Sequence, residues 1–120
     1  MSRDHRKLKV FTLADELVLK VYAESATFPP DERYGLTKQL RRAAVSVATN
    51  IVEGCARRTT RDYLHFINIA TGSAAESAYL LHVSSRLRFL RAEVYRELDE
   101  KYNELVGGLK KLIIALEGEP

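Results

Sequence analysis

The chain has 120 residues, 46% of them hydrophobic and 29% charged, with 19 lysines and arginines against 16 acidic residues. This length fits one domain that buries its own core, and the apolar content argues against disorder. A single cysteine excludes an internal disulfide, and no apolar run approaches the roughly 20 residues of a transmembrane helix. We therefore expect a soluble, cytoplasmic, all-α protein, because no stretch sustains the apolar–polar alternation of a strand.

The first predicted helix covers about residues 12–28. Thr12 and Asp15 have the spacing of a capping box, so we expect the helix to begin near Thr12. Apolar residues then recur at three- and four-residue spacing, which is typical of a helix with one buried face. Pro29 and Pro30 end it, because proline lacks the backbone donor that a helix needs and restricts the residue before it.

The second predicted helix covers about residues 32–54 and has a narrow apolar stripe bordered by small side chains, which would let a neighbouring helix approach closely. The stripe consists of Leu36, Leu40, Ala43, Val47 and Ile51. Asn50 lies on the same line and needs hydrogen-bond partners if it is buried. Gly54 stands where a left-handed C-cap is expected to end the helix.

The third predicted helix covers about residues 60–90, and Thr59 with Asp62 forms a second capping box at its start. Its apolar surface is too wide for one seam, so we expect one stripe to face the core and another to contact a second subunit. The stripe predicted as an oligomer interface comprises Ile69, Leu80, Val83 and Leu87. Gly72 and Ser73 interrupt the middle of the helix, where we expect the close approach of a neighbouring helix to compensate for the glycine.

The fourth predicted helix covers about residues 92–116, with apolar residues at alternating spacings of three and four. Such a heptad seam suits antiparallel packing against the other helices. Four helices joined by short connections predict an up-down-up-down antiparallel four-helix bundle. We expect residues 1–120 to form this single domain.

Three short motifs are specific enough to indicate a family: QLRRAA at residues 39–44, NIVEG at 50–54 and GSAAE at 72–76. Together they resemble the 23S rRNA intervening-sequence proteins, which are also catalogued as four helix bundle proteins. The resemblance implies a four-helix bundle that assembles into a ring-like homopentamer. The chain is more distantly similar to accessory proteins of diversity-generating retroelements, in which a basic pentameric barrel binds nucleic acid and a reverse transcriptase.

The polar residues of these motifs predict a structural network that fixes helix register or subunit orientation. Its members are Gln39, Arg41, Arg42, Asn50, Glu53, Ser73 and Glu76. Glu76 lies on an apolar surface of its helix and needs a partner, for which Arg41 or Arg42 is the obvious source. The alternative is a catalytic or ligand site built from Asn50, Glu53 and Glu76.

The sequence offers little for catalysis, and we expect no enzyme activity, no cofactor and no small-molecule substrate. A carboxylate-bridged metal site in a bundle needs paired Glu-x-x-His motifs, whereas this chain has one Asp62-x-x-His65 whose aspartate already serves the cap. We therefore expect no metal. Cys55 lies in a predicted loop beside arginines that could lower its pKa, but an incidental thiol is the better interpretation.

Basic residues are expected to gather at one end of the bundle, because antiparallel threading brings the ends of all four helices together there. The residues predicted to bind nucleic acid are Arg6, Lys7, Lys9, Arg57, Arg58, Arg61, Lys110 and Lys111. Phosphate backbones bind such surfaces through counterion release. The sequence thus favours a non-catalytic homo-oligomer that binds RNA or DNA. The alternative is a protein–protein interaction scaffold or accessory subunit without nucleic-acid contact.

Overall fold

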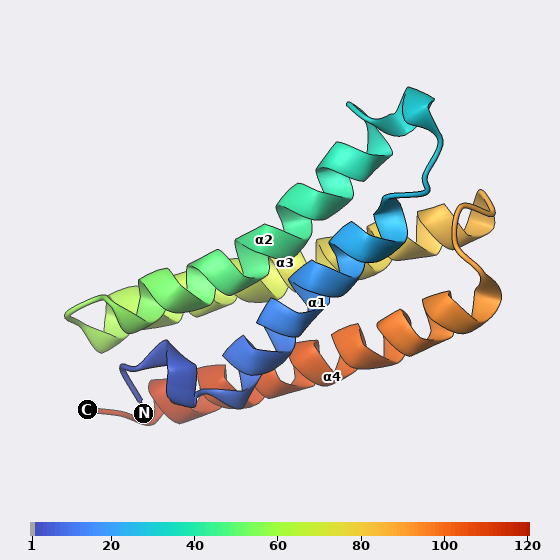
Figure 1. Cartoon of the computed structure of the whole chain (residues 1–120). Helices are drawn as coiled ribbons and strands as arrows, with labels where there is room; N and C mark the ends of the chain where they lie inside the picture. Colours follow the sequence, from blue (N-terminus) through green and yellow to red (C-terminus); the bar gives the residue numbers. More distant parts are fainter. Residues whose placement is uncertain (1) are drawn as a thin grey trace.

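The computed structural model describes residues 2–120, which form four long helices and two short 3-10 helices. The long helices are α1 (Lys9–Ser25), α2 (Leu36–Cys55), α3 (Thr60–Arg86) and α4 (Ala92–Glu117), and the short ones are η1 (His5–Lys7) and η2 (Pro30–Glu32). Successive helices run in opposite directions, so the predicted up-down-up-down arrangement is confirmed (Figure 1). The molecule is elongated, with principal extents of 48 × 24 × 19 Å.

The core follows the apolar spacing of the sequence. Every residue of the stripe predicted on α2 is buried, and α4 buries its predicted heptad seam except for Tyr95, which is partly buried. The buried seam residues are Leu98, Tyr102, Leu105, Leu109, Leu112 and Leu116. Among residues 2–120, no helix is long and apolar enough to cross a membrane.

The start of α1 differs from the prediction. The helix begins at Lys9, after the 3-10 turn η1, and the hydroxyl of Thr12 donates a hydrogen bond to the carbonyl oxygen of Leu8 at 3.5 Å instead of capping the helix. The predicted capping box at Thr12 is therefore wrong. Thr59 is confirmed as the N-cap of α3, because its hydroxyl accepts a hydrogen bond from the backbone nitrogen of Asp62 at 3.1 Å.

The end of α3 also differs, because the helix stops at Arg86 rather than near residue 90. Arg88 adopts a left-handed conformation with φ of 65°. Its N–H donates to the carbonyl of Ser85, and that of Phe89 donates to the carbonyl of Ser84, both at 2.9 Å. This is the Schellman pattern that usually uses glycine, so the sequence contained no sign of the stop.

Two glycines have roles opposite to those predicted. Gly54 is not a left-handed C-cap, because α2 continues through it and no glycine among residues 2–120 has positive φ. Instead, a Cβ atom there would lie 3.2 Å from Phe66 Cβ and Tyr63 Cδ1, so Gly54 allows α2 and α3 to approach closely. At Gly72, where we expected such an approach, a Cβ atom would meet nothing in the described chain within 4 Å.

The apolar stripe predicted as an oligomer interface on α3 is not continuous at the surface. Leu80 is only 6% exposed and belongs to the core of its own chain, so its assignment to a subunit contact is wrong. Val83 is partly buried against the same core. Ile69 and Leu87 remain, with exposed fractions of 39% and 50%.

Candidate nucleic-acid interface

Three parts of the chain meet at one end of the bundle: the segment before α1, the α2–α3 turn and the end of α4 (Figure 1). Arg3 Nη2 donates a hydrogen bond to Thr60 Oγ1 at 3.3 Å, and Tyr63 Oη donates to the carbonyl oxygen of Ser2 at 2.8 Å. Thr60 Oγ1 also donates to Glu119 Oε2 at 3.3 Å. These bonds hold the three segments together, so the prediction that antiparallel helices bring them to one end of the bundle is confirmed.

The basic residues predicted at this end are all exposed, and we call them the basic pole. Its members are Arg6, Lys7, Lys9, Arg57, Arg58, Arg61, Lys110 and Lys111. Two of them have acidic partners: Arg6 Nε lies 3.0 Å from Asp4 Oδ1, and Arg57 Nη2 lies 3.9 Å from Glu53 Oε2. The hydrogen bond from Arg6 lowers the pKa of Asp4, so this carboxylate stays ionised. Within residues 2–120 the other members form no ion pair.

Arg57 is contacted by residues of both helices that flank the α2–α3 turn. Its guanidinium lies 4.5 Å from the centre of the Phe66 ring, in a cation–π contact. The carboxylate of Glu53 on α2, one helical turn before Arg57, forms an ion pair with the same guanidinium. The side chain is thus oriented before any ligand arrives.

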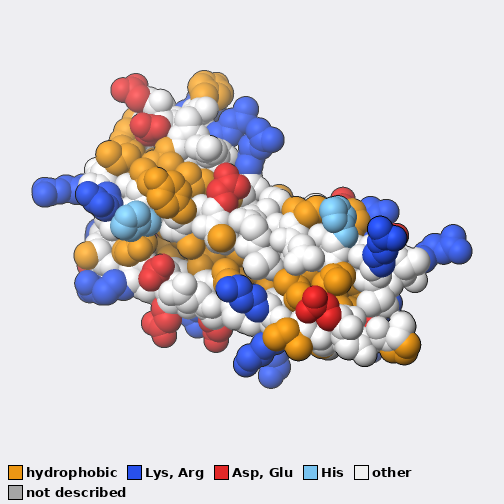
Figure 2. Space-filling view, turned by 180° about the vertical axis from the view of Figure 1, so that it is seen from behind, with side chains coloured by type: hydrophobic (Ala, Val, Ile, Leu, Met, Phe, Trp, Pro, Cys, Tyr) orange, Lys and Arg blue, Asp and Glu red, His pale blue; other side chains and the backbone are white. Residues whose placement is uncertain are grey.

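The opposite end of the bundle is also basic, which the sequence prediction did not weigh. Arg33, Arg86, Arg88 and Arg91 are exposed there, and only Arg91 has an acidic partner among the described residues, Glu93 at 3.6 Å. Lysine and arginine side chains are accordingly visible at both ends in Figure 2. Positive charge alone therefore does not distinguish the basic pole from the other end.

The predicted polar network is divided into separate contacts. Asn50 Nδ2 donates to the carbonyl oxygen and the hydroxyl of Ser46, at 2.8 and 3.0 Å. Ser46 Oγ in turn lies 2.8 Å from Ser73 Oγ, which joins α2 to α3. Ser46 is thus the centre of this contact, and its spacing of four residues from Asn50 was the signal available in the sequence.

Arg41 connects α2 to α1 rather than to Glu76. Its Nε donates to Ser25 Oγ at 2.8 Å, its Nη2 donates to the carbonyl oxygen of Tyr22 at 3.3 Å, and its guanidinium lies 4.5 Å from the centre of the Tyr22 ring. Arg42 does not replace it, because the described chain gives neither Arg42 nor Glu76 a hydrogen bond or an ion pair. The predicted ion pair at Glu76 is therefore wrong for the single chain.

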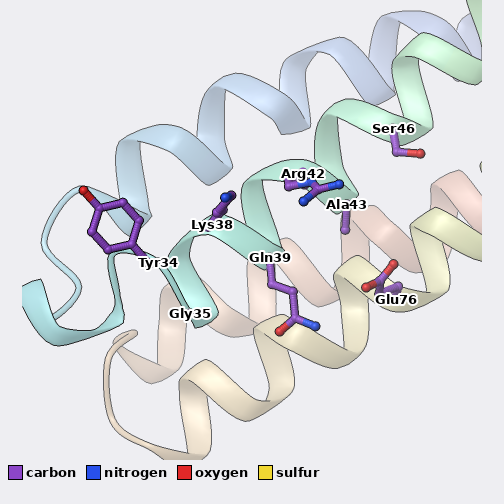
Figure 3. A pocket seen from close by; sticks show the side chains of 8 residues that line it. All are labelled: Tyr34, Gly35, Lys38, Gln39, Arg42, Ala43, Ser46 and Glu76. Carbon is purple, nitrogen blue, oxygen red and sulfur yellow. The ribbon is translucent and has the colours of Figure 1, made fainter.

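Glu76, Gln39 and Arg42 instead line an open groove between α2 and α3 (Figure 3). Asn50 and Glu53 line an adjoining hollow farther along α2, which shares Arg42 and Ser46 with the groove. The alternative catalytic group is consequently not brought together by the fold, since its three members lie in two places. Of the residues that the structure describes, no three histidines, cysteines or carboxylates are grouped so that they could hold a metal ion.

Cys55 is the last residue of α2 and is buried, not part of a loop. Its thiol donates a hydrogen bond to Tyr63 Oη at 3.4 Å. Burial raises the pKa of Cys55 and outweighs the opposing effects of that hydrogen bond and of nearby Arg3. The expectation that arginines would lower the pKa of this thiol is thus wrong.

Comparison with known proteins supports the fold and the family. The solved structure of a protein of unknown function from the S23 ribosomal protein family of Bacteroides thetaiotaomicron is similar, with a TM-score of 0.78 and 22% sequence identity. The similarity covers 87% of this chain and 97% of that one. A comparison with curated proteins finds no match. Residues 6–111 match the family described as 23S rRNA-intervening sequence protein, and the chain belongs to that family.

Proposed function

We propose that this protein is a non-catalytic RNA-binding protein that holds phosphate groups at the basic pole. The observation that carries the proposal is the convergence of exposed lysines and arginines from three chain segments, most of them without an acidic partner in residues 2–120. The family's name connects it with ribosomal RNA, so RNA is the first ligand to test.

The mechanism is electrostatic. Each lysine or arginine that neutralises a phosphate releases condensed counterions, which favours binding without base-specific contacts. Arg57, Arg58 and Arg61 follow one another around the α2–α3 turn and are the proposed phosphate contacts. Arg57 is already oriented by Glu53 and Phe66, so less side-chain freedom is lost when it binds a phosphate.

The test is the salt dependence of binding to a structured RNA, measured by fluorescence anisotropy. We expect Arg57→Glu/Arg58→Glu/Arg61→Glu to weaken binding at least about tenfold and to reduce the slope of log K against log salt by about two to three. The matched control is Arg86→Glu/Arg88→Glu/Arg91→Glu, which reverses the same number of charges at the opposite end. Equal losses in both variants would indicate non-specific attraction and overturn the proposal for the pole.

A second candidate function is a protein–protein interaction scaffold. It is favoured by large apolar side chains that stay exposed on α3 and directly after it, namely Ile69, Tyr79 and Leu87. Exposed apolar residues of this size are a feature of contact surfaces when they lie together. Recovery of a protein partner that survives nuclease treatment, together with a flat salt response toward RNA, would support this function over the first.

A further inference from the structure

The groove between α2 and α3 is the second place where unpaired polar groups converge. It has a volume of about 460 Å³ and is lined by Tyr34, Lys38, Gln39, Arg42 and Glu76, together with smaller residues. Figure 3 shows Tyr34 at one end and Glu76 on α3 toward the other end, with Lys38, Gln39 and Arg42 on α2 between them and Ser46 beyond. The volume falls within the range of roughly 300–1,000 Å³ that is usual for small-ligand sites.

The two cations of the groove are placed unfavourably for the isolated chain. Lys38 and Arg42 are one helical turn apart, about 6 Å along the axis, and like charges at this spacing destabilise a helix. Neither has an ion pair with any residue from 2 to 120. An anion bound between them would remove the repulsion, so the pair is suited to a phosphate group.

Tyr34 adds an aromatic surface beside these cations. Tyr34 is 80% exposed and makes no contact with the core, which is unusual for a large aromatic residue. The guanidinium of Arg33 lies 5.6 Å from the ring centre, while the rest of the ring is open to solvent. Exposed aromatic rings beside basic groups stack on unpaired nucleobases.

We propose that this groove binds one nucleotide of single-stranded RNA together with the ribose that precedes it. The base stacks on Tyr34, its 5′-phosphate lies between Lys38 and Arg42, and the carboxylate of Glu76 accepts a hydrogen bond from the 2′-hydroxyl of the preceding ribose. A free nucleotide offers the same base and phosphate, and the experiment below separates the two sources. The site shares its ligand class with the basic pole but not its surface, so either can fail without the other.

The stacking contact is tested first, with a labelled 12-nucleotide oligouridylate and an RNA duplex, in the wild-type protein and in the Arg57→Glu/Arg58→Glu/Arg61→Glu background. Tyr34→Ala is expected to weaken oligouridylate binding roughly five- to hundredfold and to leave duplex binding within about twofold, because duplex bases are already stacked. Tyr34→Phe keeps the ring and should bind like the wild type. Tyr79→Ala removes another exposed tyrosine that does not line the groove and is the control.

The charged contacts are tested with Lys38→Glu/Arg42→Glu against Arg86→Glu/Arg88→Glu, which changes the same charge elsewhere. Only the first variant should lose oligouridylate binding, and Glu76→Gln should reduce the preference for RNA over the matching DNA. Calorimetry with AMP decides the source: saturable binding that Tyr34→Ala abolishes indicates a free nucleotide, and binding of the oligonucleotide alone indicates RNA.

Three results would overturn the proposal. Oligouridylate affinity that Tyr34→Ala leaves unchanged would exclude stacking, and an equal loss on the duplex would exclude preference for single strands. If Lys38→Glu/Arg42→Glu bound RNA normally but changed the molar mass in solution, the groove would be a contact between copies of the chain. If only the proposed function of the basic pole were wrong, Arg57→Glu/Arg58→Glu/Arg61→Glu would bind duplex RNA like the wild type. The effect of Tyr34→Ala on oligouridylate affinity would still be seen in that background.

Discussion

The thiol of Cys55 lies close to Arg3 in space, yet it is buried at the end of α2 and donates its hydrogen bond to Tyr63. Burial raises the pKa of the thiol, which keeps it protonated at neutral pH, and the thiolate is the reactive form. We expect a disulfide reagent such as DTNB to react with the native protein at least about tenfold more slowly than with the denatured chain. Equal rates at pH 7.5, with and without denaturant, would contradict this assignment.

Sequence spacing identified the right polar residues but not their partners. Arg41 and Arg42 are adjacent, and only the crossing of α1 over α2 decides that Arg41 reaches Ser25 while Arg42 faces the groove. The basic pole was predictable because it depends only on the order and direction of the helices. Hydrogen-bond partners depend on helix rotation and offset, which apolar periodicity does not fix to within one residue.

At the scale of whole elements, Gly54 and Gly72 provide a matched pair for measuring helix packing. Gly54→Ala would place a methyl group 3.2 Å from Phe66 Cβ, Tyr63 Cδ1 and the carbonyl oxygen of Tyr63, so α2 and α3 would have to separate slightly. We expect this variant to lose about 1–3 kcal/mol of unfolding free energy. Gly72→Ala meets open space in the described chain and should gain about 0.5–1 kcal/mol from helix propensity.

Urea unfolding followed by circular dichroism measures both variants. A loss of stability in Gly72→Ala would contradict the expectation, and it would indicate that another chain packs against that position.

Helix number, order and buried faces could be predicted because each depends on a repeated apolar pattern, as on α2 and α4. Helix ends depend on one or two residues and were less predictable. Thr12 had the sequence of a cap but lies inside α1, whereas Arg88 ends α3 in a conformation more typical of glycine. A boundary set by an unusual residue leaves no regular signal in the sequence.

For the whole molecule, the predicted homo-oligomer, for which the family resemblance favours a pentamer, can be tested through Ile69 and Leu87, the two residues of the predicted interface stripe that stay exposed. We expect light scattering to give a multiple of the chain mass for the wild type and the mass of one folded chain for Ile69→Glu/Leu87→Glu. Leu80→Glu is the contrasting variant: this side chain is buried in its own core, so the charge should unfold the chain and abolish the helical circular dichroism signal.

The oligomer and the RNA groove are coupled by their positions. Glu76 lies on α3 between Ile69 and Leu87, so a second chain packed against those residues would cover the groove. A ligand that binds only the uncovered chain shifts the equilibrium toward it. We therefore expect saturating oligouridylate to lower the average mass of the wild type, while Ile69→Glu/Leu87→Glu binds the oligonucleotide more tightly. A wild-type chain that is already monomeric would contradict assembly through this face, and an oligomer whose mass is unchanged by bound RNA would place the contact on another surface.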